Sequence, residues 1–151
     1  MSKPVIVIRK VEDSPDWVDR ELLTAYIRTE YRGENDAVLH IGCALPPMLL
    51  RRLSNNRIRT LAVLTAWNPA SVLLPEKENW LRTRTLKEDL SLVCTTFWRG
   101  FNVDPGERWP AEESFWAFGI DAARAVALGR RYGQNALVWW EPGATPALWW
   151  L

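Results

Sequence analysis

Strand-like segments follow one another along this sequence without a helix between them, and this feature constrains the fold most. Residues 95–103 are followed by residues 114–120, and residues 135–140 by residues 146–151, with turn-rich segments such as Asp104-Pro105-Gly106-Glu107 in between. A parallel pair of strands needs a crossover connection, usually a helix. A purely parallel sheet is therefore excluded, and antiparallel pairing is expected within both pairs.

Helical patterns separate the remaining segments. We expect one helix from Ser14-Pro15-Asp16 to Gly33, and others from Pro46, from Pro75 and over residues 122–132. Further strands are expected at residues 37–41 and 60–67, and the second of these is almost entirely apolar, which is typical of a strand covered on both faces. The sequence predicts an α+β fold, with residues 1–151 forming a single compact domain. Its sheet is expected to be mixed or mainly antiparallel, with five to six strands packed with three to four helices.

The composition is that of a globular protein with no overall attraction for polyanions. The 151 residues are 48% hydrophobic and 25% charged, and the net charge of +1 gives no field that would draw in nucleic acid or a membrane. No segment approaches the roughly 20 apolar residues of a membrane-spanning helix. Two cysteines and one histidine form no disulfide framework and no recognised zinc motif. We therefore expect a cytoplasmic protein that needs no metal or cofactor.

Four groups of residues together resemble a known family. They are Thr65-Ala66-Trp67-Asn68-Pro69-Ala70-Ser71, then Asn79 with Arg82, then Trp109-Pro110 with Glu112-Glu113-Ser114, and finally Gly129-Arg130-Arg131-Tyr132-Gly133-Gln134-Asn135-Ala136. In combination they resemble the bacterial DUF3293 family, whose function is unknown, over a region from about Tyr26 to the end of the chain. The resemblance implies one bacterial domain and implies no activity, so the function has to be argued from the residues.

Polar side chains at the ends of apolar elements define a candidate ligand site. Asn68 and Ser71 follow the strand at residues 60–67, and Asn79 and Arg82 share one face of the next helix. Strand ends, helix N-termini and Arg side chains favour polar or anionic ligands, although an ordinary turn and a solvated helix face explain the same residues. The expected ligand is polar or anionic and nucleotide-like, and the expected ligand-binding residues are Asn68, Ser71, Asn79, Arg82, Trp109, Ser114, Gln134 and Asn135.

Three residues are candidates for catalysis, although the sequence leaves open whether the chain is an enzyme. Glu112 would be the acid or base, because a carboxyl group beside aromatic surface can have a raised pKa, and Arg82 would hold an anion. His40 has the right chemistry for acid–base catalysis, but a lone histidine of this kind is more often a packed, hydrogen-bonded residue. The chain lacks catalytic triads, phosphate loops and dinucleotide motifs. The reaction would therefore be a metal-independent hydrolysis or transfer, including that of a nuclease.

Two hypotheses from other classes remain open. The last two strands are crowded with Trp139, Trp140, Trp149 and Trp150, and one indole of each adjacent pair must face away from the other. These rings need burial on two sides, or a docked protein partner such as a second copy in a homodimer. Alternatively, the chain binds nucleic acid non-specifically through a basic cluster of Arg51, Arg52, Arg57 and Arg59, although the net charge does not favour it.

Overall fold

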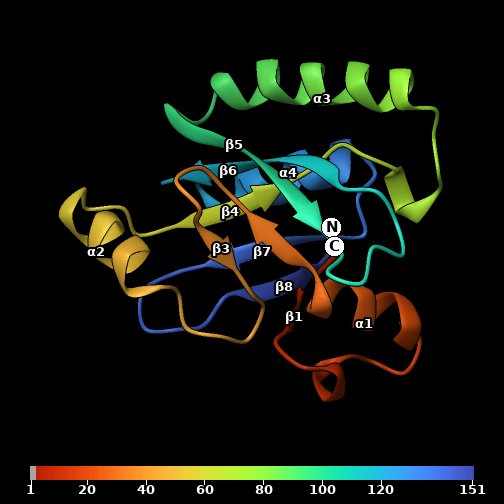
Figure 1. The fold of residues 1–151 in the computed structure, drawn as a ribbon, viewed down its shortest axis with the longest axis horizontal. Helices are drawn as coiled ribbons and strands as arrows, with labels where there is room; N and C mark the ends of the chain where they lie inside the picture. Colours follow the sequence, from red (N-terminus) through yellow and green to blue (C-terminus); the bar gives the residue numbers. More distant parts are fainter. Residues whose placement is uncertain (1–2) are drawn as a thin grey trace.

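The computed structural model describes residues 3–151 and contains one eight-stranded sheet in which every strand pair is antiparallel (Figure 1). The order across the sheet is β1-β8-β7-β4-β6-β5-β2-β3. The expected α+β class is confirmed, but the sheet is larger than the predicted five to six strands. The strands are β1 (Ile6–Ile8), β2 (Glu30–Arg32), β3 (Val38–Leu39), β4 (Leu61–Leu64), β5 (Thr96–Val103), β6 (Glu112–Phe118), β7 (Ala136–Trp140) and β8 (Ala147–Trp150).

The strands β1 and β2 account for the difference from the prediction. Each has three residues, which is too short for an alternating pattern to stand out. The first helix, α1 (Arg20–Arg28), begins later and ends earlier than expected. The carboxylate of Asp19 caps it by accepting a hydrogen bond from the backbone N–H of Leu22 at 2.9 Å. The chain leaves the helix at Thr29 and enters β2 at once, so a segment predicted as helix is a strand.

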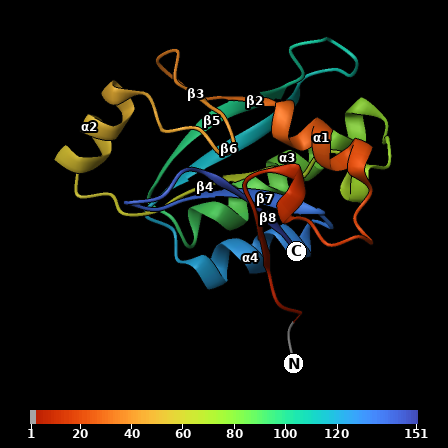
Figure 2. The same cartoon turned by 90° about the horizontal axis from the view of Figure 1, so that it is seen from below.

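Alternation along the strands gives the sheet two apolar faces, each with its own helices. On one face, which we call the outer face, α3 (Glu76–Ser91) and α4 (Ala122–Arg131) bury side chains such as Leu86 and Leu128. Figure 2 shows α4 below the strands β7 and β8, with β2 and β3 above them. The helices α1 and α2 (Pro47–Asn55) contribute to the core of the opposite, inner face. Four α-helices match the prediction, and two 3-10 turns, η1 (Val11–Asp13) and η2 (Pro69–Ser71), complete the described elements.

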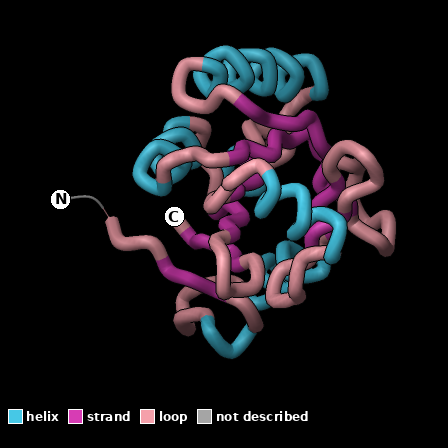
Figure 3. The backbone as a smooth tube through the Cα atoms, turned by 90° about the vertical axis from the view of Figure 1, so that its left-hand side faces the viewer, coloured by secondary structure: helices cyan, strands magenta, loops and turns pink. Residues whose placement is uncertain are grey.

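The sheet curls around its inner face, so that its two edges approach each other (Figure 3). The backbone N–H of Gly42, after β3, donates to the carbonyl oxygen of Pro146, before β8, at 2.8 Å. Gly42 has a φ of +78°, and a Cβ atom there would lie 2.8 Å from the carbonyl oxygen of Arg9. Only glycine combines this backbone conformation with so close an approach. The contact ties the β3 edge to the chain around β1 and β8.

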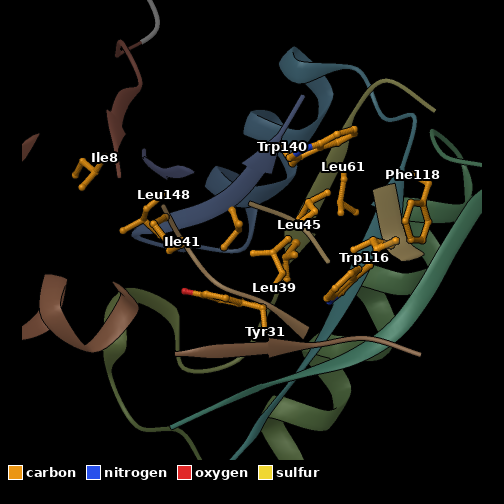
Figure 4. Close-up of a cluster of buried hydrophobic side chains, with 14 of the residues drawn as sticks. Ile8, Tyr31, Leu39, Ile41, Leu45, Leu61, Trp116, Phe118, Trp140 and Leu148 are labelled. Carbon is orange, nitrogen blue, oxygen red and sulfur yellow. The ribbon is translucent and has the colours of Figure 1, made fainter. Parts of the chain in front are cut away.

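The inner face is filled by rows of side chains that lie opposite one another on neighbouring strands. One row is apolar and runs from Trp98 through Trp116, Val63, Val138 and Leu148 to Ile8. Figure 4 shows Leu39 and Tyr31 next to each other in the middle of this core, with Trp116 and Phe118 to one side and Leu148 and Ile8 to the other. The apolar row forms the base above which the candidate site is built.

Candidate functional site

A cavity of about 510 Å³ lies at the end of the inner face where β4 and β5 end and β6 and β7 begin. Its walls come from α1, β2, β8 and the loops that follow β4 and precede β6. The lining is mostly apolar and includes several polar side chains. Its size and composition are typical of sites that bind small organic molecules.

The polar groups of this cavity form a row across the sheet. Asn102 lies opposite Tyr31 in the β2–β5 pair and opposite Glu112 in the β5–β6 pair. Continuing the register of β4 beyond Leu64 places Trp67 between Glu112 and Gln134, and the side-chain amide of Gln134 donates to the carbonyl oxygen of Trp67 at 3.0 Å. All five side chains line the cavity. We call Tyr31, Asn102, Glu112, Trp67 and Gln134 the polar row.

The loop after β4 is held in a strained conformation beside the polar row. Asn68, Ala70 and Ser71 have φ values of 42°, 52° and 62°. Residues other than glycine rarely adopt this left-handed conformation, and they keep it only when their surroundings fix it. A backbone hydrogen bond helps to hold this loop in place, because the N–H of Ala70 donates to the carbonyl oxygen of Gly133 at 2.8 Å.

The buried side chain of Asn79, in the first turn of α3, also holds this loop. Its Oδ1 atom accepts a hydrogen bond from the backbone N–H of Asn68 at 2.9 Å, and its Nδ2 atom donates to Oδ1 of Asn68 at 2.7 Å. The same Oδ1 of Asn68 also accepts from the backbone N–H of Leu74 at 3.0 Å. With its oxygen occupied twice, the Asn68 amide must direct its Nδ2 atom toward the cavity.

The carboxyl group of Glu112 accepts a hydrogen bond from that amide. Nδ2 of Asn68 donates to Oε1 of Glu112 at 3.1 Å. Burial raises the pKa of the Glu112 carboxyl above its ordinary value, and the hydrogen bond from Asn68 opposes part of this rise. The adjacent Glu113 lies on the outer face and pairs with Nε of Arg99 at 2.7 Å. Of these two neighbouring carboxyl groups, only Glu112 faces the cavity.

Tyrosine and serine hydroxyl groups connect α1 to the loop at the mouth of the cavity. Oγ of Ser71 accepts from the side-chain amide of Asn135 at 3.1 Å and lies 3.4 Å from the hydroxyl oxygen of Tyr26. The hydroxyl group of Tyr31 donates to the carbonyl oxygen of Tyr26 at 2.8 Å. Burial raises the pKa of both tyrosines, so both remain protonated hydrogen-bond donors at neutral pH.

The structure brings most of the predicted site residues together. Asn68, Ser71, Asn79, Trp109, Gln134 and the predicted acid–base residue Glu112 all line the cavity. Asn135 contacts this group through Ser71. Three other predicted residues, Arg82, Ser114 and His40, are not part of the lining.

Each of these three has a different environment. Arg82 donates through Nε to the carbonyl oxygen of Ala66 at 2.8 Å and through Nη2 to that of Tyr132, so its guanidinium group braces the loop from behind. Ser114 is completely buried on the inner face, and its Oγ has no partner among the described residues. His40 is exposed directly after β3. None of the three is placed to contact a molecule in the cavity.

Sequence reasoning missed Tyr26, Tyr31 and Asn102 as cavity residues. Asn102 could have been found, because it alternates with Trp98 and Gly100 along β5 and therefore belongs to their inner face. Tyr31 could not, because the short strand β2 was not recognised. Tyr26 lies in a segment that was expected as helix, and its hydroxyl group was not singled out.

The tryptophans of the last two strands are covered by the chain itself. Trp140 and Trp150 are buried in the inner core, while Trp139 is buried on the outer face. Trp149 is partly buried and stacks on Trp139 with ring centroids 4.5 Å apart. Burial on both sides therefore needs no partner protein.

The basic cluster lies apart from the cavity. Arg51, Arg52, Arg57 and Arg59 are exposed on α2 and the segment that follows it, and none of them lines the cavity. Arg52 lies over the ring of Trp98, with its guanidinium carbon 4.9 Å from the centroid. Within residues 3–151, no group of three or more His, Cys, Asp or Glu side chains is arranged to hold a metal ion. No helix of the same residues is both long and apolar enough to cross a membrane.

Comparison with known proteins gives a family match that covers the centre of the chain. Residues 64–137 match the family model described as "Protein of unknown function (DUF3293)". The matched segment contains Asn68, Asn79 and Glu112, together with the rest of the polar row apart from Tyr31. No curated protein and no solved structure matches the chain.

Proposed function

Because the chain belongs to the DUF3293 family, whose description gives no function, we propose from its own side chains that the cavity binds a small organic molecule. The observation that carries this proposal is the fixed polar row over a mostly apolar space of about 510 Å³. Strained loops persist at binding sites because preformed geometry lowers the entropy lost when a ligand binds. The loop at Asn68, held by Asn79, has this character.

In this proposal Glu112 is the central hydrogen-bonding group. Its Oε1 atom is held by Asn68, while no hydrogen bond from residues 3–151 reaches Oε2. A ligand in the cavity would complete the hydrogen bonds of this carboxyl group, and the surrounding aromatic side chains would contact its apolar body.

A second candidate function is acid–base catalysis by Glu112 in a metal-independent hydrolase or transferase. The raised pKa of Glu112 favours it, because a carboxyl group that titrates closer to neutrality exchanges protons more readily with a substrate. Turnover of a bound compound that is lost in Glu112→Gln, with binding retained, would separate catalysis from binding alone.

The proposal treats residues 1–151 as one bacterial, cytoplasmic domain. The single sheet that runs through the described residues supports the expectation of one domain. The two free cysteines, Cys43 and Cys94, support a reducing compartment.

A pair of tryptophan variants tests whether the cavity binds ligands. Trp109 lines the cavity, whereas Trp80 is 54% exposed on α3 and does not line it. A thermal-shift screen with small organic compounds should find ligands that raise the Tm of the wild type, because a ligand specific for the folded state stabilises it. The shift should shrink in Trp109→Ala and persist in Trp80→Ala. Equal shifts in both variants would place binding elsewhere and refute the proposal.

A further inference from the structure

The charge of the cavity wall limits which ligands it can take. Two carboxyl groups, those of Glu112 and Glu76, are part of the lining, and the lining contains no Lys, Arg or His. The nearby cation, Arg82, is turned away and is satisfied by two backbone carbonyl groups. A phosphate or carboxylate would therefore meet two acids and no base, so this wall opposes the anionic ligand expected from the sequence.

Two hydrogen-bond acceptors lie side by side in the polar row. Asn102 and Glu112 are directly opposite each other in the β5–β6 pair. Oδ1 of Asn102 is buried and has no hydrogen-bond partner among the described residues. Together with Oε2 of Glu112, it forms a pair of acceptors that a group with two or more N–H bonds would satisfy. A buried acceptor without a partner is unfavourable, so a donor bound there gains affinity.

Aromatic side chains surround the same space. Tyr26, Tyr31, Trp67 and Trp109 all line the cavity. The faces of such rings carry partial negative charge and attract organic cations. The rings also provide apolar surface for the body of the ligand. The carboxyl groups, the amide oxygen of Asn102 and the aromatic rings therefore all favour a positively charged ligand.

We infer that the cavity takes a small organic cation, an ammonium or amidinium group carried on an apolar body, with the charged group against Asn102 and Glu112. This inference rests on the proposed function and specifies its ligand class. The N–H groups would donate to Oδ1 of Asn102 and to Oε2 of Glu112, and the apolar body would extend toward Val63 and Val138, which line the cavity below the polar row.

Three probes of nearly equal shape test the inference: benzylammonium, benzyl alcohol and benzoate. Their binding to the full chain is measured by isothermal titration calorimetry at neutral pH. Benzylammonium should bind about tenfold more tightly than benzyl alcohol, and benzoate should bind least. Equal binding of the amine and the alcohol, or preference for benzoate, would overturn the inference while leaving small-molecule binding intact. If none of the three bound, the inference would be wrong, and the tryptophan pair would still test the cavity.

Two adjacent glutamates provide matched variants. Glu112→Gln should remove the preference for benzylammonium over benzyl alcohol while retaining the binding of the alcohol. Glu113→Gln should leave all three affinities unchanged, because Glu113 lies on the outer face. A preference that survives in Glu112→Gln would contradict the assigned position of the charge. If circular dichroism shows that Glu112→Gln is unfolded, the relative affinities of the three probes for the wild type still test whether the cavity prefers a cation.

Discussion

Replacing Asn79 with Ala should destabilise the chain by about 3 kcal/mol. Its side chain is 1% exposed, accepts from the backbone N–H of Asn68, and donates to Oδ1 of Asn68 and to the carbonyl oxygen of Leu74. Each such bond contributes about 1 kcal/mol net, and leaving the N–H of Asn68 without an acceptor adds about 1–3 kcal/mol. The 3.3 Å bond to Leu74 is the weakest and is left out of the sum, so the two shorter bonds and the lower end of the penalty give a total of about 3 kcal/mol.

Urea denaturation followed by tryptophan fluorescence measures this loss. The midpoint should fall with little change in the m-value, because the surface exposed on unfolding is nearly the same in both chains. The control is Asn56→Ala, which removes an exposed side chain that donates to the carbonyl oxygen of Arg52 at the end of α2. It should lower stability by less than about 1 kcal/mol. An equal loss in the two variants would refute the argument that Asn79 holds the loop.

Three other substitutions test the site and its supports. Burial raises the pKa of Glu112 above 4.5 in the folded chain, so the wild type should lose stability relative to Glu112→Gln as the pH rises above 4.5. A constant difference in Tm between the two chains would contradict the raised pKa. Arg82→Lys should cost about 1–2 kcal/mol in urea denaturation because an ammonium group does not reproduce the two-pronged contact, whereas exposed Arg84→Lys should change stability by less than about 0.5 kcal/mol. In Gly100→Ala the new Cβ atom would lie 2.3 Å from the carbonyl oxygen of Arg32, so the Tm should fall by about 10 °C or more, and an unchanged Tm would show that β2 can move away.

The segments that could be predicted are those whose signals are local. The apolar run at residues 60–67 contains the fully buried strand β4. The helix expected over residues 122–132 is α4, whose N-terminus is capped by the side chain of Asp121. The two consecutive strand pairs are antiparallel, as the absence of a helix between them requires. These features depend on a few neighbouring residues, so one sequence is sufficient to predict them.

What could not be predicted depends on pairing between distant segments. Asn102, Glu112 and Tyr31 meet only because of the registers of β2, β5 and β6, and no local pattern specifies those registers. Arg82 was expected to hold an anion because of its place near the N-terminus of α3. The direction of its guanidinium group was decided instead by the carbonyl groups of Ala66 and Tyr132, which the loop leaves within reach.

The cavity draws its walls from both ends of the chain, and this has a consequence for protein synthesis. Tyr26 and Tyr31 come from the first quarter of the sequence, whereas Leu148 belongs to β8, the last strand of the sheet. A nascent chain emerging from the ribosome therefore has no closed binding site until β8 has been translated and paired with β7. A compound that fits the cavity can rescue a destabilised variant only after translation has passed that strand, by trapping molecules that have already reached the native state.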